Sequence, residues 1–462
     1  MPINSFLYPG AKVTTGYDVA NSCRFDDGSS SYLHKTPSSG GNRRTFTFST
    51  WFKRGTGFGN EQAIFTGGND ANAQGFFTIY FTTNDRIDAH FWNGSSFDSV
   101  TPNGVLRDSS AWTHIVVGVD TTQSTAANRI KWYINGTEQT SLYSTDYPDQ
   151  NHEFNVNHTA IMQVGVRRNG SAALAGYYDG YLAETVLIDG TQLDATSFGE
   201  FDSDSPNIWK PIDVSGLTFG TNGFYLDFED SSNLGNDVNG GTDLTAVNLA
   251  ATDQSTDTCT NNFATLNPLF ATQDSGTMSE GNTIYTASAN AWGGSGSTIG
   301  LSQGKWYFEA QINDNAGGHF FGVIDETANV NDNPHQRTGS TFYYSGSGGQ
   351  MYKDGSGSGS YGTFGASDIA GVALNLDDDE ITIYKNGSAI VTDFALSTTK
   401  NTLFVWVMGY NSGSDLVKVN FGGTPPFSIS SSNSDANGYG NFEYSVPSGY
   451  YSINTKNLAE FG

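Results

Sequence analysis

The sequence predicts an all-β protein built from two antiparallel β-sandwiches that are joined by an ordered connector. Three observations lead to this. Turn-forming residues are frequent, with 56 glycines in 462 residues, and aromatic residues are plentiful, with 31 Phe, 23 Tyr and 8 Trp. In many short segments apolar and polar positions alternate, which is typical of strands with one face in a core. Because single cores rarely grow beyond about 250–300 residues, a chain of this length is expected to divide into domains.

The first sandwich is predicted over residues 17–200, after an N-terminal arm of residues 1–16. The stretch 129–134 alternates with period two, and Asn135-Gly136 then favours a tight hairpin because both residues tolerate positive φ. A run that is apolar on both faces, residues 115–119, indicates a central strand. The one helix expected here is a short one around residues 193–201.

A connector is predicted over residues 201–270, because its composition differs from the segments on either side. It contains Pro206 and Pro211, one clear strand at residues 224–228 and a polar run at residues 230–243. The apolar side chains of that strand need cover, so the connector is expected to pack on a sandwich.

Strand patterns return over residues 271–430, where the second sandwich is predicted. Residues 306–310 and 381–384 read as strands, and Asn386-Gly387 repeats the hairpin signal. Two Gly/Ser clusters between aromatic strands are predicted to be loops. The last segment, residues 431–462, is expected to fold back as a tail.

The charge balance excludes several classes of partner. With 21 Lys+Arg against 47 Asp+Glu the formal net charge is −26, so nucleic acid is a poor partner.

The chain starts without a basic and apolar leader, and it contains no apolar stretch long enough to span a membrane. Only Cys23 and Cys259 are present, so no disulfide framework is predicted, although pairing of these two stays open.

Four segments of the first predicted sandwich resemble the laminin-G-like or concanavalin A-like family. They are residues 46–52 (FTFSTWF), 112–117 (WTHIVV), 132–136 (WYING) and 179–184 (DGYLAE). The second predicted sandwich resembles a SPRY domain at residues 304–309 (GKWYFE), 371–376 (GVALNL), 383–387 (IYKNG) and 419–422 (VNFG). The resemblance implies two concanavalin A-like sandwiches of the jelly-roll type.

The pairing of these two domains, with residues 256–268 (TDTCTNNFATLNP) between them, is similar to virion proteins of tailed bacteriophages, particularly marine ones. This resemblance implies a protein of the particle surface that is made in the host cytoplasm without a signal peptide. Its partners would be other virion proteins and host cell-surface glycans, with many copies or a homo-oligomer on each particle. It implies the fold more strongly than the function, because lectin-like sandwiches have many roles.

An enzymatic role is not predicted. Glycoside hydrolysis needs two opposed carboxylates, and the acidic stretches 200–204 and 227–230 lack two suitably spaced glutamates. No nucleophile elbow accompanies any of the seven histidines. His114, within the WTHIVV segment, is interpreted as a structural histidine.

No cofactor is predicted, with calcium as the open alternative, because calcium binds carboxylate and carbonyl oxygens from loops. Surface turns are the simpler interpretation of the acidic runs, including residues 377–380. The candidate calcium ligands are Asp230, Asn233, Asp237, Asn239 and Asp243.

Recognition by loop aromatics is the chemistry that the sequence favours. Sugars stack on aromatic rings, and Asn, Asp and backbone groups bind their hydroxyls. The candidate ligand-binding residues are Trp92 with Asn93, and Tyr343, Tyr344, Tyr352 and Tyr361 beside the Gly/Ser loops. Packing in a core is the competing interpretation for each ring.

The predicted function is adhesion to host glycans by a virion surface protein of tail-fibre or receptor-binding type. The first alternative is a capsid or tail decoration protein that binds only other virion proteins. The second is a polysaccharide-degrading enzyme.

Overall fold

The computed structural model describes residues 16–68, 75–168, 173–272, 276–288, 292–313, 318–332, 341–397, 400–410 and 415–462. The predicted N-terminal arm therefore lies outside the described residues, apart from Gly16. Nearly all regular structure is β-strand, as predicted, and the chain divides into compact units whose boundary falls between Thr260 and Asn261.

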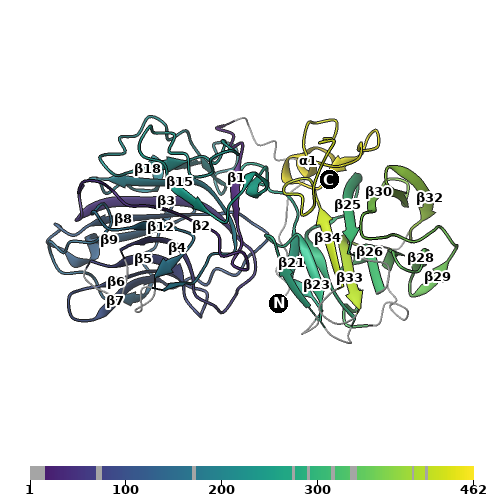
Figure 1. Cartoon of the computed structure of the whole chain (residues 1–462), viewed down its shortest axis with the longest axis horizontal. Coiled ribbons are helices and arrows are strands. Elements are labelled where there is room, and N and C mark those ends of the chain that lie inside the picture. Colours follow the sequence, from purple (N-terminus) through teal and green to yellow (C-terminus); the bar gives the residue numbers. More distant parts are fainter. Residues whose placement is uncertain are drawn as a thin grey trace. The chain divides into compact units, whose positions relative to one another are not determined.

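The first unit contains two eight-stranded antiparallel sheets (Figure 1). The first sheet consists, in order, of β10 (Thr137–Glu138), β9 (Ile130–Ile134), β8 (Thr113–Asp120), β3 (Thr45–Arg54), β15 (Gly180–Asp189), β1 (Ser22–Phe25) and β20 (Gln254–Ser255), with β18 (Phe224–Leu226) beside β15. The second consists of β11 (Leu142–Thr145), β7 (Phe97–Pro102), β6 (Ile87–Trp92), β5 (Phe77–Phe81), β4 (Gln62–Gly67), β12 (Met162–Val164), β2 (Tyr32–Lys35) and β19 (Thr245–Val247).

Two short hairpins and three 3-10 turns complete the first unit. The hairpins are β13 (Arg167–Arg168) with β14 (Leu174–Ala175), and β16 (Gly199–Phe201) with β17 (Trp209–Pro211). The turns are Ala126–Asn128, Ala195–Ser197 and Ala251–Asp253.

Phenylalanines from facing sheets meet in the first core. Phe48 of β3 stacks on Phe65 of β4, with ring centroids 4.6 Å apart. Two residues earlier on β3, Phe46 contacts Phe77 of β5 edge to face at 5.3 Å. All four rings are fully buried. The period-two spacing of Phe46 and Phe48 therefore places both rings between the sheets.

The predicted connector is part of the first sandwich up to residue 260. Its strands β18, β19 and β20 extend the two sheets by pairing with β15, β2 and β1. Trp209 and Phe219 from this segment are buried with Trp51 in a cluster on the other side of β3. The connector thus covers the outer face of the first sheet.

The predicted helix over residues 193–201 is wrong. Asp194 caps only the single 3-10 turn Ala195–Ser197, by accepting a hydrogen bond from the backbone N–H of Thr196 at 2.9 Å. Strand β16 begins at Gly199 and pairs with β17, which brings Trp209 to the buried cluster. Thr, Ser and Gly are weak helix formers, so packing of this hairpin prevails.

The second unit contains a seven-stranded and an eight-stranded sheet (Figure 1). The first is β21 (Leu266–Ala271), β24 (Trp292–Leu301), β33 (Leu403–Tyr410), β26 (Gly318–Asp325), β27 (Thr341–Ser345), β28 (Gln350–Lys353) and β29 (Ser356–Ser358). The second is β22 (Gly276–Ser279), β23 (Ile284–Ala287), β34 (Leu416–Asn420), β25 (Lys305–Ile312), β30 (Ile369–Asn375), β31 (Glu380–Lys385) and β32 (Ser388–Ala395), with β35 (Tyr451–Ser452) beside β25.

The C-terminal segment folds back on this second sandwich and ends in α1 (Thr455–Phe461). Strand β35 pairs in parallel with β25. The fully buried carboxylate of Glu309 on β25 accepts hydrogen bonds from the backbone N–H groups of Glu443 and Tyr444, at 3.0 and 2.9 Å. Phe442 packs edge to face on Tyr307 at 5.2 Å, so the tail is held by both polar and apolar contacts.

Candidate functional site

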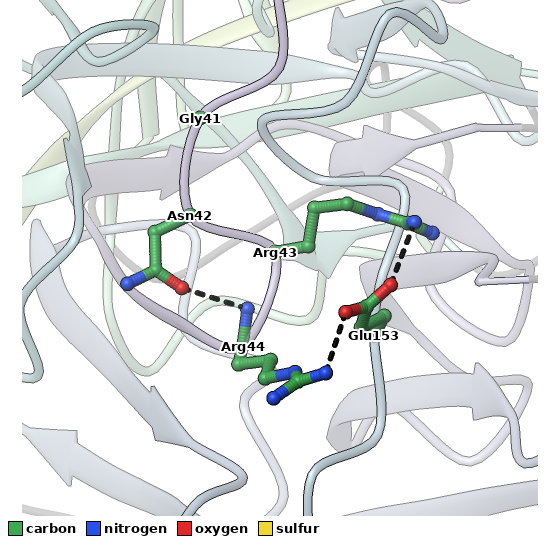
Figure 2. A pocket seen from close by; sticks show the side chains of 5 residues that line it. All are labelled: Gly41, Asn42, Arg43, Arg44 and Glu153. Carbon is green, nitrogen blue, oxygen red and sulfur yellow. Dashed lines mark hydrogen bonds and ion pairs between the residues drawn. The ribbon is translucent and has the colours of Figure 1, made fainter.

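A pocket of about 410 Å³ opens on the first sandwich and is lined by polar groups (Figure 2). We call it the rim pocket; its lining residues are Gly41, Asn42, Arg43, Arg44 and Glu153. Two guanidinium groups meet one carboxylate there. Arg43 donates to Glu153 Oε2 at 3.0 Å, and Arg44 donates to Glu153 Oε1 at 2.7 Å. Each oxygen of the carboxylate thus contacts a different arginine.

The backbone that carries these arginines is fixed by a buried acid and by a side-chain turn. Asp189 accepts a hydrogen bond from the N–H of Asn42 at 2.7 Å. The Asn42 Oδ1 accepts from the N–H groups of Arg44 and Thr45, both at 3.0 Å. A Cβ on Gly41 would lie 1.9 Å from the Asp189 carboxylate, so only glycine allows this close approach.

Arg43 is also held independently of Glu153. Its Nε donates to the carbonyl of Phe154 at 2.7 Å, and its second terminal nitrogen donates to Asn155 Oδ1 at 3.4 Å. The Arg43 side chain is 26% exposed, whereas those of Arg44 and Glu153 are 43% and 44% exposed. The pocket therefore combines one anchored and one exposed guanidinium.

The predicted pair Trp92 and Asn93 lies where β6 turns into β7. Asn93 Oδ1 accepts hydrogen bonds from the N–H groups of Ser95 and Ser96, at 2.8 and 2.9 Å, and therefore holds this turn. Trp92 is half-buried and contacts Phe97 edge to face at 5.0 Å. Trp92 is thus partly accessible, while the amide oxygen of Asn93 stabilises the hairpin.

His152 joins the loop that carries Glu153 to the end of β6. Its ring lies 6.4 Å from that of Phe91, the neighbour of Trp92 on β6, and burial lowers the pKa of this histidine. Its ring also packs on Phe154 at 4.7 Å. Since Glu153 lies between these two residues in sequence, the end of β6 and the rim pocket border the same loop.

The four predicted tyrosines do not form an exposed sugar-binding group. Tyr343 and Tyr344, on β27, are fully buried on opposite faces of their sheet, so the prediction that they face a ligand is wrong. Tyr352 is half-buried and packs on Tyr343 at 6.1 Å. Tyr361 is also half-buried and lies against the second core. These rings fill the sandwich because neighbouring positions of a strand alternate between two covered faces.

Each carboxylate of the candidate calcium loop accepts hydrogen bonds from protein groups, although the buried Asp237 Oδ2 accepts none from the described residues. Asp237 accepts from the N–H of Tyr225 at 3.0 Å and faces the ammonium of Lys35 at 3.9 Å. Asp243 accepts from the N–H of Asp237 at 3.0 Å and from the Asn233 amide at 2.8 Å.

The two other predicted ligands take part in the same loop. Asp230 accepts from the N–H of Ser232 at 2.9 Å, and the N–H of Asn239 donates to Asp237 at 3.2 Å. The loop is closed by protein donors at each of its three carboxylates.

A different acidic group was not predicted from the sequence. Carboxylate oxygens of Asp26, Asp27 and Asp179 lie within 4.8 Å of one another. Burial is the largest cause that raises the pKa of Asp179 to about 7, and the neighbouring acids Asp27 and Asp26 add to it, whereas the hydrogen bonds from Thr56 act in the opposite direction. In the sequence, Asp26 directly follows β1 and Asp179 directly precedes β15. The pairing of these two strands brings the two acids together, and sequence alone does not show that pairing. These are the residues that could hold a cation.

The residues that could suggest catalysis have structural partners. His114 is buried; Trp209 Nε1 donates to its Nδ1 at 3.0 Å, so the proton on Nε2 is donated to Ser49 at 2.9 Å. Burial lowers the pKa of His114 to about 3. Glu200 and Asp202 both pair with the ammonium of Lys210, at 3.2 and 3.3 Å. The interpretation of His114 as structural agrees with these contacts.

Comparison with known families identifies both sandwiches. Residues 27–191 match the concanavalin A-like lectin/glucanases superfamily in its laminin-G form, and residues 305–424 match the SPRY domain. The chain carries a laminin-G-type domain followed by a SPRY domain. No curated protein matches the chain.

Three solved structures illustrate the similarity of the chain to known folds. The SPRY domain of human HERC1 is 21% identical, with 33% of this chain and 96% of that chain covered and a TM-score of 0.30. A putative carbohydrate binding protein from Bacteroides ovatus is 15% identical, with 50% and 58% covered and a TM-score of 0.33. A heptameric pentraxin from Limulus polyphemus is 14% identical, with 38% and 80% covered and a TM-score of 0.29.

Within the described residues, no helix is long and apolar enough to cross a membrane. Cys23 and Cys259 are both free thiols, with Cys23 buried.

Proposed function

We propose that this chain is a non-enzymatic protein of a virus-particle surface, of tail-fibre or receptor-binding type, that adheres to glycans of the host cell. The observation that supports this most is the polar rim pocket of the laminin-G-type domain, whose Glu153 follows His152, a residue that packs on Phe91 beside the half-buried Trp92. The pocket offers polar groups to a sugar, and Trp92 offers a ring on which a sugar can stack.

The mechanism is reversible binding by a rigid scaffold. Strands β3 and β6 are fixed by their cores, so the loops between strands present their side chains with little loss of conformational entropy. Weak single contacts become tight when many copies on one particle bind one cell surface. No cofactor is required by this mechanism, and the partners are host glycans together with neighbouring virion proteins.

Binding of the full-length chain to host cells and to a panel of their surface glycans at seawater salt tests the proposal. We expect specific binding that Trp92→Ala weakens about tenfold, as loss of one aromatic contact of ~1.4 kcal/mol would do. The matched control is Trp292→Ala, because Trp292 is another half-buried tryptophan but lies on β24 of the second sandwich. Absence of all cell and glycan binding would instead favour a decoration protein that binds only other virion proteins.

A further inference from the structure

We infer that the rim pocket is an anion site for the carboxylate of an acidic sugar, and that Glu153 occupies this site in the free protein. The inference rests on the proposed function, since it names the class of glycan that the same pocket would bind. It follows from the arrangement of Arg43, Arg44 and Glu153, which point toward one another in Figure 2.

The two guanidinium groups already have the geometry of carboxylate recognition. One planar carboxylate receives one hydrogen bond on each oxygen, at 3.0 and 2.7 Å, and each bond comes from a different arginine. Charge-assisted bonds of this kind are shorter and stronger than neutral ones, and the flat donor groups of arginine match a flat carboxylate. A uronic or sialic acid presents the same group on a sugar ring.

The basic pair is positioned without help from Glu153. Arg43 is anchored to the carbonyl of Phe154 and to Asn155, and the Asn42 turn fixes the backbone of Arg44. If the Glu153 side chain moves away, one guanidinium thus stays in place and the other remains tethered beside it. A ligand carboxylate therefore meets a site that is largely preorganised.

Displacement of Glu153 costs little. Its side chain is 44% exposed and that of Arg44 is 43% exposed, and ion pairs between such exposed groups contribute little to stability. The freed Glu153 carboxylate becomes solvated. A rigid sugar acid that also contacts neighbouring groups can therefore replace it.

The charge of the whole chain makes this site selective. The protein carries a formal charge of −26, so acidic glycans are repelled by most of its surface. At the rim pocket two positive groups face one negative group, which leaves a local excess of one positive charge. Acidic glycans are consequently directed to this point, and their binding should weaken with increasing salt.

The test measures binding of the full-length protein to an oligosaccharide that contains uronic acid, to its carboxyl-reduced neutral form, and to a sulfated form of that neutral sugar. We expect Arg44→Gln to weaken binding of the uronic acid sugar about tenfold or more, as loss of a charged hydrogen bond would do. Glu153→Gln should strengthen it about threefold to tenfold, since the internal competitor loses its charge.

The exposed pair Lys131 and Glu138 provides the matched controls. These side chains form an ion pair at 3.0 Å on the same sandwich, neither of them lines the pocket, and they are 29% and 43% exposed. Lys131→Gln and Glu138→Gln should therefore change binding by less than about twofold. They separate loss of the pocket from a change in the net charge of the protein.

The outcomes distinguish this inference from the proposed function. Binding of the neutral form as tight as that of the uronic acid form, with no effect of Arg44→Gln, overturns the anion site but leaves glycan adhesion intact. A preference for the sulfated form over the uronic acid form also overturns the assignment to a carboxylate. Failure to bind any glycan, on cells or purified, contradicts both proposals.

Discussion

Single buried residues show how this protein places polar groups inside a β-sandwich. Glu184 on β15 is the clearest case, because it is 5% exposed and adopts a φ of 48° at an irregularity between β15 and β3. Its carboxyl group accepts a hydrogen bond from the hydroxyl of Tyr225 at 2.8 Å, and that hydroxyl lies 3.0 Å from the hydroxyl of Tyr17. Burial raises the pKa of Glu184 to about 8.

The raised pKa of Glu184 predicts that the first sandwich loses stability as pH rises from 6 to 8. An unfolded chain ionises Glu184 near pH 4.5, whereas the folded chain keeps its proton up to about pH 8. The folded state thus holds more protons in this window, and its free energy of unfolding falls by at most about 1.4 kcal/mol per pH unit. Between pH 6 and pH 8, Glu184→Gln should reduce the fall in the free energy of unfolding by about 1–2 kcal/mol.

Hydrogen exchange of β15 and β18 in the full-length chain at both pH values measures this effect. The control is Glu138→Gln, because Glu138 is exposed on the same sandwich and should leave the pH dependence as it is. An equal loss of protection in the wild type and in Glu184→Gln would contradict the assignment to Glu184. Burial also raises the pKa values of Asp88 and Asp179 to about 7. Their contribution to the pH dependence of stability is the same in the wild type and in Glu184→Gln.

Individual side chains were also the hardest feature to predict from sequence. Alternation shows that one face of a strand is buried, but it does not show that the second face is covered too. Tyr343 and Tyr344 are neighbours on β27, and both are fully buried because each face of that sheet has its own cluster. Arg43, Arg44 and Glu153 escaped prediction because their pairing joins residues 109–110 positions apart.

At the scale of elements, local signals gave correct predictions where the structure depends on neighbouring residues. The pairs Asn135-Gly136 and Asn386-Gly387 both form the predicted hairpin turns, and all four residues have positive φ between 45° and 77°. Of the connector strands, β18 lies within the strand predicted at residues 224–228, whereas β19 and β20 were not predicted, because their partners lie far away in sequence. The helix predicted over residues 193–201 failed for the same reason.

The polar loop of residues 230–243 should keep its conformation when divalent cations are removed. Its carboxylates at Asp230, Asp237 and Asp243 accept hydrogen bonds from protein groups, so no cation is needed to close it. We expect hydrogen exchange of Asp237 and Asn239 to change less than about twofold when a chelator is added. A large increase in exchange that calcium reverses would instead show that the loop binds calcium, the alternative that the sequence left open.

At the scale of the whole molecule, composition and aromatic content were sufficient to predict an all-β chain with two sandwiches. Each unit has its own aromatic core, in which the apolar faces of its two sheets cover each other. The boundary between them lies at residues 260–261, ten residues before the predicted end of the connector. Sequence could not locate it, because residues 266–271 form a strand that pairs only with β24.

Adhesion without chemistry is the central claim for the whole molecule, and one measurement tests it most directly. Purified full-length protein is mixed with host surface polysaccharide, and bound polysaccharide and new reducing ends are followed together over time. Our account predicts saturable binding that Trp92→Ala weakens, with no new reducing ends. Sustained release of reducing ends that a single Asp or Glu substitution abolishes would contradict it and identify a polysaccharide-degrading enzyme.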